Sequence, residues 1–148
     1  MSEKNNKDVI DSLENLLANI NATYSLAQLF HWNVTGPNFK SLHELFEEIY
    51  TDLAIRLDET AERIRALGEK ILRDFRDRSS FSLDDQGEVD GWPDMLKHLI
   101  LAFDSIRHSA KIVLEKAEAN NDDVTISLID DLRSSEQKFV WMLKSTLE

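Results

Sequence analysis

The amino-acid sequence predicts an all-α fold, a four-helix bundle with one long crossover between the second and third helices. Only four glycines and two prolines occur among the 148 residues, so few positions interrupt helical structure. Apolar residues recur three or four positions apart along four stretches of the chain. The length suits one domain with a sizeable core, and we expect residues 1–148 to form that single domain.

The first predicted helix runs from about Asp8 to Val34, after a polar tail of residues 1–7 that we expect to be short and flexible. Its apolar residues repeat at the spacing of one helix face. One histidine lies on that face. The face consists of Leu13, Leu17, Ile20, Tyr24, Ala27, His31 and Val34.

The second predicted helix begins after the Gly36-Pro37 break, with Asn38 close to its cap, and fades after Gly68. It is amphipathic, because its apolar residues again recur at helical spacing. The apolar stripe contains Leu42, Leu45, Phe46, Ile49, Leu53, Leu57, Ile64 and Leu67. A second stripe beside it contains His43, Glu47, Tyr50, Ala54, Asp58 and Ala61.

The crossover spans roughly Gly68 to Gly91. Apolar spacing within it predicts a short helix of about two turns that contains Ile71, Leu72 and Phe75. Arginines alternate with aspartates in the same segment, so we expect an exposed, salt-bridged surface rather than a nucleic-acid patch. These charged residues are Arg73, Asp74, Arg76, Asp77 and Arg78.

Pro93 marks the first turn of the third helix, which we expect to continue to about Ala119, before a turn at Asn120-Asn121. The core face of this helix contains Leu96, Leu99, Ile100, Phe103, Ile106, Ala110, Val113 and Leu114. His98 and His108 lie off that face, so we expect surface or packing roles for them.

Asp122 and Asp123 open the fourth helix, where acidic side chains complement the helix dipole. Its inward residues are Leu128, Leu132, Phe139, Met142 and Leu143. Asp130 and Asp131 follow in the same helix and complete a cluster of four acids. The cluster is interpreted either as a helix cap with a solvated face or as an acidic pore at a three-fold axis that concentrates cations.

Two pairs of potential metal ligands lie on the second helix. His43 and Glu47 are four residues apart, as are Asp58 and Glu62, so the members of each pair are neighbours on the helix surface. Eleven residues separate Glu47 from Asp58, which is about 16 Å of helix. One helix therefore cannot place both pairs around the same ion.

A two-fold axis can bring the pairs together, because both have the same midpoint in this helix. If the helix packs antiparallel on its own copy about that midpoint, His43 faces the partner's Glu62 and Glu47 faces the partner's Asp58. Small Ala54 near the crossing allows a close approach. Since a two-fold interface uses the same patch on both chains, the two sites are identical.

His31 supplies another nitrogen from the first helix. A single histidine on an apolar face is more often a buried core residue, and a single carboxylate is more often a solvated one. Two histidines and three carboxylates together favour a metal site, whose mixed ligands suit iron, zinc or manganese. Trp32, beside His31, is either a core or interface aromatic or a functional one.

The chain resembles the Dps family of bacterial mini-ferritins over nearly its whole length. The motifs that carry the resemblance are His31-Trp32-Asn33-Val34-x-Gly36, Leu42-His43 with Glu47, Asp58-x-x-Ala61-Glu62-Arg63, and Trp141-Met142-Leu143. The resemblance implies a ferritin-like bundle that dimerises through the second helix and closes into a dodecameric hollow shell.

The resemblance also implies residue roles. His31, His43 and Glu47 of one subunit would bind iron together with Asp58 and Glu62 of the two-fold mate, forming an inter-subunit ferroxidase site with one or two irons, where zinc is a possible substitute. The enzyme would oxidise Fe²⁺ with hydrogen peroxide, or with O₂, and store ferric mineral. Trp32 near the iron would intercept one-electron oxidants.

Two departures from the family pattern stand out. The first acid is usually Asp, whereas this chain has the longer Glu47, which keeps the carboxylate and can shift metal position or affinity. The family often has a Gly- and Pro-containing turn after the second helix, where this chain has Gly68-Glu69-Lys70-Ile71.

No Glu-x-x-His motif occurs, so the di-iron centre within a single ferritin bundle is excluded and an iron site must lie between subunits.

Composition limits the alternatives. The absence of cysteine excludes disulfides and thiolate sites, and neither a membrane span nor a signal peptide is evident, so a cytoplasmic protein is expected. A DNA-binding nucleoid protein is the main alternative function. A net charge of −11 per chain argues against it, because DNA phosphates would be repelled and Lys4 and Lys7 are too few to compensate. The other alternative is a non-catalytic shell protein.

Overall fold

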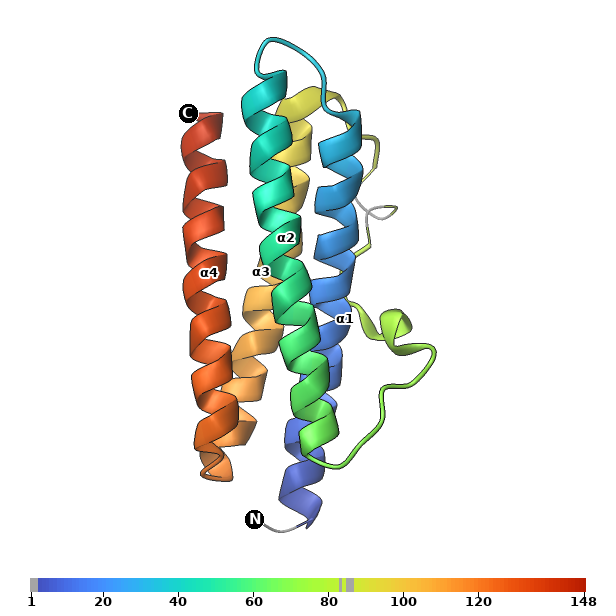
Figure 1. Cartoon of the computed structure of the whole chain (residues 1–148), viewed down its shortest axis with the longest axis vertical. Helices are drawn as coiled ribbons and strands as arrows, with labels where there is room; N and C mark the ends of the chain where they lie inside the picture. The colour runs from blue at the N-terminus through green and yellow to red at the C-terminus, as the bar shows by residue number, and fades with distance from the viewer. Residues whose placement is uncertain (1–2, 83, 85–86) are drawn as a thin grey trace.

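The computed structural model describes residues 3–82, 84 and 87–148, and it confirms the all-α four-helix prediction. No strand occurs in this described part of the chain. The elements, drawn in Figure 1, are α1 (Glu3–Asn33), α2 (Phe39–Ala66), the short 3₁₀ helix η1 (Phe75–Arg78), α3 (Gly91–Ala119) and α4 (Asp123–Leu147).

The bundle consists of two helical hairpins placed side by side (Figure 1). α1 packs against both α2 and α3, α4 packs mainly against α3, and the contact between α2 and α4 is sparse. The crossover returns along the length of the bundle beside α1, so the chain termini lie at opposite ends. Leucine, isoleucine and phenylalanine side chains from all four helices fill one continuous core. None of the described helices is both long and apolar enough to cross a bilayer.

Two predicted boundaries were wrong. α1 begins at Glu3 rather than Asp8, so the expected tail is helical from that residue onward, and residues 1–2 lie outside the described part. The crossover helix is shorter than predicted, with four residues of 3₁₀ geometry that start at Phe75. Ile71 packs against the core but Leu72 is exposed, so the segment lacks a continuous apolar face that would stabilise two α-helical turns.

Buried Asn19 of α1 holds the crossover in place. Its side-chain carbonyl accepts hydrogen bonds from the Ser79 hydroxyl at 2.9 Å and the Ser80 amide at 2.8 Å. Its amide group donates to the Ser109 hydroxyl of α3 at 3.3 Å. Arg78, expected in a surface salt-bridge network within the crossover, instead forms an ion pair with Glu14 of α1. Polar contacts to α1 therefore determine the path of the crossover.

The two remaining histidines differ in their environments. His98 was predicted to lie off the core face of α3, but it is buried, and its Nδ1 donates to the Asp94 carbonyl at 2.6 Å. His98 therefore has a packing role, as expected. Its predicted position off the core face was wrong, because the hydrogen bond to the carbonyl of its own helix allows the imidazole to be buried. His108 is exposed, as predicted.

Asp122 joins the start of α4 to the end of α2. Its carboxylate accepts from the Thr125 amide at 3.1 Å as the N-cap, and from the Arg63 guanidinium at 2.9 Å. Arg63 also donates to the Thr125 hydroxyl at 2.9 Å. Although burial raises it, the hydrogen bonds from Thr125 and the charge of Arg63 hold the pKa of Asp122 below its ordinary value. The capping interpretation is confirmed for this aspartate, whereas Asp123 is exposed.

Replacing this carboxylate should destabilise the fold substantially. Asp122→Ala removes the cap and leaves the Arg63 charge without its partner, so we expect unfolding free energy to fall by about 3 kcal/mol. Asp123→Ala, at the neighbouring exposed position, should change it by less than about 0.5 kcal/mol. Urea unfolding at pH 7 and one fixed protein concentration measures both values.

The same contact gives a pH signature. Because the folded-state pKa of Asp122 is depressed, its contribution is fully present above the ordinary aspartate pKa of 3.8 and is lost as pH falls through the folded value. The stability gap between the wild type and Asp122→Ala should therefore be constant above about pH 5 and shrink below about pH 4. A gap that stayed constant down to pH 3 would contradict this account.

Candidate metal centre

A tight turn between α1 and α2 brings two histidines together. His31 lies in the last turn of α1 and His43 in the second turn of α2, with Gly36 between them at φ +109°, a conformation that disfavours a side chain. The two imidazole rings stack with their centroids 3.8 Å apart and their planes 14° from parallel. The helix break predicted from Gly36-Pro37 therefore creates the pairing of the two rings.

Each histidine is hydrogen-bonded to the backbone of the other. His31 Nδ1 lies 2.8 Å from the His43 carbonyl oxygen, and His43 Nδ1 lies 2.7 Å from the His31 carbonyl oxygen. A carbonyl oxygen can only accept, so both Nδ1 atoms carry the proton. In the neutral rings, both Nε2 atoms then keep a lone pair, which is the arrangement of metal-binding histidines whose other nitrogen is held by a carbonyl.

Aromatic side chains surround the histidine pair. Phe39 stacks on His43 with ring centroids 5.0 Å apart, and Tyr50 meets His31 edge-on at 5.2 Å. Tyr24 in turn packs edge-on against Tyr50 at 6.0 Å. His31 is only 8% exposed. These contacts fix the orientation of both imidazoles without occupying a hydrogen-bonding nitrogen.

The predicted carboxylates lie along the exposed side of α2. Glu47 follows His43 by one turn, and burial together with the Glu47 charge raises the pKa of Tyr50. Farther along, Asp58 and Glu62 are exposed neighbours. The protonated form of Glu62 can donate a hydrogen bond to the Asp58 carboxylate, and this bond, together with the repulsion between the two charges, raises the pKa of Glu62. This pair of carboxylates has the character of a half-site for a cation, since a bound positive charge would relieve the repulsion.

The single chain does not bring the two halves together. His31 and His43 are adjacent and Asp58 and Glu62 are adjacent, but no group of three potential ligands converges anywhere in the described residues. Between the halves, α2 presents a shallow groove of about 560 Å³ whose lining includes Ala54, Ile55 and Asp58. Ile55 is exposed in the middle of this surface.

Trp32 lies on the outer side of α1 and is 64% exposed, so it is not a core residue. It remains either an interface aromatic or a functional one, as predicted. Tyr50, by contrast, was placed by the sequence on the same stripe as His43, but its contact with His31 required the three-dimensional structure.

Comparison with known proteins identifies the family of this chain. The family model described as a ferritin-like domain matches residues 10–148. A relative named DNA protection during starvation protein 2, from Bacillus anthracis, is 33% identical over 146 residues, covering 96% of this chain and 98% of its own. The chain belongs to the Dps family.

Solved Dps structures share the whole fold. The Dps protein of Vibrio cholerae O1, described as a member of a broad superfamily of ferritin-like diiron-carboxylate proteins, aligns with a TM-score of 0.92 at 30% identity, covering 100% of this chain and 94% of that one. The Dps protein of Bacillus brevis aligns with a TM-score of 0.90 at 30% identity and full coverage of both chains. The ferritin-like four-helix fold, with a short helical turn in the crossover, is thus the fold of this chain.

The histidine pair offers a direct test of metal binding. His31→Ala combined with His43→Ala removes both free Nε2 atoms, so we expect the affinity for Fe²⁺ under anaerobic conditions to fall by at least about 100-fold. This loss should exceed the loss caused by removing a residue that only orients a metal ligand. The fold should persist, because α1 and α2 keep their core contacts. Titration followed by equilibrium dialysis measures the affinity, and His108→Ala is the matched control at an exposed site. Unchanged affinity in the double variant would rule out these ligands.

Proposed function

We propose that this Dps-family protein stores and detoxifies iron: it binds Fe²⁺ at sites shared by two subunits, oxidises it, and retains the ferric product as mineral inside a hollow shell. The observation that carries the proposal is the His31–His43 pair, whose mutual backbone hydrogen bonds leave two Nε2 lone pairs available. The diiron-carboxylate description of the Vibrio cholerae relative supports iron as the metal.

Two subunits complete each site in this proposal. His31, His43 and Glu47 bind from one subunit, and the partner's Asp58 and Glu62 bind from the other. The exposed Ala54 and Ile55 surface of α2 supports an antiparallel crossing at the middle of the helix, which makes the two sites equivalent. The mutual repulsion of Asp58 and Glu62 is relieved when Fe²⁺ binds. The two carboxylates thus supply negative charge to the site, and the two histidines supply ligand atoms whose orientation is already fixed.

The proposed reaction uses hydrogen peroxide as a two-electron oxidant. Two Fe²⁺ give one electron each to H₂O₂, its O–O bond breaks, and two protons are taken up to yield two Fe³⁺ and two water molecules. Because both electrons leave together, no hydroxyl radical is released. O₂ is the alternative oxidant. The exposed Trp32 beside His31 is proposed to intercept one-electron oxidants that escape this pairing.

Electrostatics favour cations over nucleic acid. Asp123, Asp130 and Asp131 are exposed near the start of α4, which supports the proposal of an acidic entrance for Fe²⁺. The relatives' names refer to DNA protection, which we propose is achieved here by removing iron and peroxide within the cytoplasm. A shell of twelve copies at −11 each carries a charge of about −132, which repels DNA phosphates.

Retention of iron by the protein tests storage. After Fe²⁺ is added without oxygen and hydrogen peroxide follows, gel filtration should recover far more than about two irons per chain, the capacity of a two-metal site. Such retention requires oxidation and an enclosed cavity. Retention of two or fewer irons per chain would contradict the storage proposal. If the same sample still oxidised Fe²⁺ at a normal rate, the proposal of a catalytic site would stand without storage.

Mixing variants tests whether two chains share a site. His31→Ala/His43→Ala and Asp58→Asn/Glu62→Gln each destroy every site in their own dimers. Random co-assembly should form half mixed dimers with one intact site each, which restores about one quarter of wild-type oxidation. No recovery after unfolding and joint refolding would mean that each site lies within one chain. Refolded wild type, taken through the same steps, sets the full rate.

A further inference from the structure

Tyr50 of α2 packs against two rings of the neighbouring helix. Its ring meets His31 edge-on, with centroids 5.2 Å apart and an interplanar angle of 74°. It meets Tyr24 edge-on as well, at 6.0 Å and 87°. Tyr24 and His31 are seven residues apart, about two turns of α1, so both lie on the same face of that helix. One side chain of α2 is therefore in contact with a proposed iron ligand and with a second aromatic residue of α1.

The orientation of the Tyr50 ring is fixed by this packing. Tyr24 and Tyr50 are both partly buried and pack against the hydrophobic core. The Tyr24 hydroxyl accepts a hydrogen bond from Gln28 Nε2 at 3.5 Å, which ties Tyr24 to the next turn of α1. Rings packed edge to face at the border of a core have few alternative rotamers. The position of Tyr50 is thus set within the single chain.

The polar end of Tyr50 lies close to Glu47. The two residues are three positions apart on α2, so their side chains are neighbours on the helix surface. Burial and the Glu47 charge raise the pKa of Tyr50 above its ordinary value of 10.0. A charge has this effect when it lies within about 6 Å. Among the residues that the structure describes, none receives a hydrogen bond from the Tyr50 hydroxyl, so its proton is available to a carboxylate.

Glu47 lacks the support that the two histidines have. His31 and His43 are oriented by hydrogen bonds to the backbone, whereas Glu47 is exposed and forms neither a hydrogen bond nor an ion pair with any described residue. A glutamate has several rotatable bonds, so ordering it around a metal costs conformational freedom. Carboxylate ligands are generally held by hydrogen bonds from residues that do not touch the metal. A donor beside Glu47 would supply that support.

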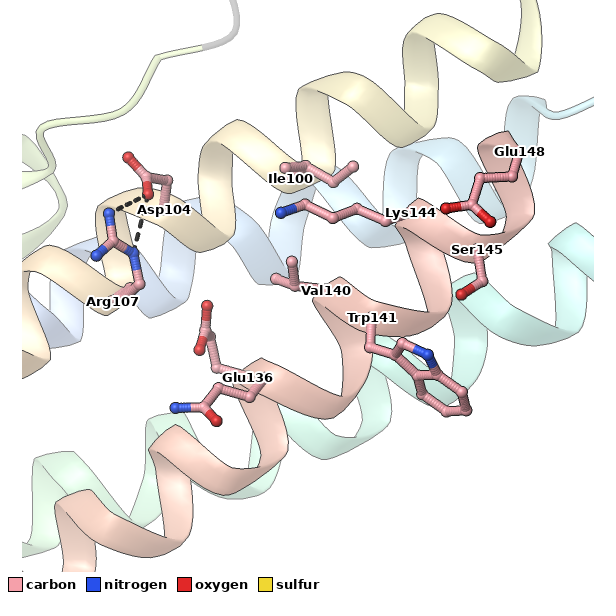
Figure 2. Close-up of a pocket in the computed structure, with 10 residues that line it drawn as sticks. Ile100, Asp104, Arg107, Glu136, Val140, Trp141, Lys144, Ser145 and Glu148 are labelled. Carbon is pink, nitrogen blue, oxygen red and sulfur yellow. Dashed lines mark hydrogen bonds and ion pairs between the residues drawn. The ribbon is translucent and has the colours of Figure 1, made fainter.

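The other hairpin contributes nothing to these ligands. A groove of about 720 Å³ between α3 and α4 contains charged side chains, among them Glu136 and Lys144, and in it Arg107 is bound to Asp104 (Figure 2). All the residues that line this groove belong to α3, to α4 or to the residue after α4. Within the described chain, support for ligands on α1 and α2 therefore comes from their own hairpin, where Tyr50 lies.

We propose that Tyr50 positions two ligands of the shared iron site: its ring holds the imidazole of His31, and its hydroxyl donates a hydrogen bond to the Glu47 carboxylate when iron binds. One side chain thereby links a ligand on α1 to a ligand on α2. This inference rests on the proposed function, because Tyr50 has this role only if both residues bind Fe²⁺. Tyr50 touches neither iron nor oxidant in this account, so it is a positioning residue.

Tyr50→Phe separates the hydroxyl from the ring. Phenylalanine keeps the edge contacts with His31 and Tyr24, but the hydrogen bond to Glu47 is lost. We expect the affinity for Fe²⁺ under anaerobic conditions to fall by about 10-fold or more, the usual effect of removing a residue that holds a metal ligand. Equilibrium dialysis measures the affinity, and circular dichroism shows that the helices are retained. An affinity equal to that of the wild type would overturn the proposal.

A double-mutant cycle shows whether the effect passes through Glu47. Glu47→Ala removes the acceptor, so adding Tyr50→Phe to this variant should change the Fe²⁺ affinity by less than about twofold. If Tyr50→Phe lowered the affinity equally with and without the Glu47 carboxylate, the hydroxyl would act through another group. The proposed hydrogen bond would then be wrong.

Two further variants control for the loss of a hydroxyl. Tyr24→Phe removes the hydroxyl that accepts from Gln28, and Thr51→Val removes one at an exposed position one turn after Glu47. Both variants should bind Fe²⁺ with the affinity of the wild type. A loss in Thr51→Val equal to that in Tyr50→Phe would contradict the assignment, because the role would then not belong to Tyr50.

The outcomes also separate this inference from the proposed function. If His31→Ala combined with His43→Ala leaves the Fe²⁺ affinity unchanged, the proposed site is wrong and Tyr50 has no ligands to position. If that double variant loses Fe²⁺ while Tyr50→Phe binds it like the wild type, the proposed site stands and the positioning role is wrong.

Discussion

The length of a rigid helix is the constraint on which the proposed site depends. About 16 Å of α2 separate Glu47 from Asp58, and an α-helix cannot shorten that distance without breaking its hydrogen bonds. The histidine half and the carboxylate half of the site therefore remain apart in a single chain. This separation makes a second subunit a chemical requirement of the proposal, rather than an addition to a complete site.

The histidine half achieves its order through the backbone. Because each imidazole donates to the carbonyl of the other histidine's residue, the end of α1 and the start of α2 hold each other in register. The same two bonds determine which nitrogen carries the proton. A change in the turn would thus alter both the distance between the rings and their tautomers. Asp58 and Glu62 have no comparable hydrogen bonds to the backbone among those described. In the proposed site, their side chains would become ordered when a cation and a partner subunit bind.

The four helices could be predicted from the sequence, because long apolar repeats are their main determinant. α1 extended past its predicted start, since polar residues can continue a helix that is already formed. The crossover helix was mispredicted because Leu72 is exposed, so the segment lacks the continuous apolar face that its spacing suggested. The path of the crossover also depends on hydrogen bonds from Ser79 and Ser80 to Asn19, a residue distant in sequence.

For the site, motif spacing was enough to nominate His31 and His43 and to expect their proximity. The mutual backbone bonds could not be foreseen, because they depend on the exact geometry of the turn. The assignment of Asp58 and Glu62 to a shared site stays a prediction, since it concerns two chains.

The division of the bundle into two hairpins has a consequence for biosynthesis. Every proposed iron ligand lies in the α1–α2 hairpin, so all of them are synthesised before α3 and α4. A nascent chain nevertheless holds only separated halves of the site, and the surface that would join two hairpins must wait for a second polypeptide. In the proposed mechanism, iron oxidation would therefore begin only after two chains have met through α2.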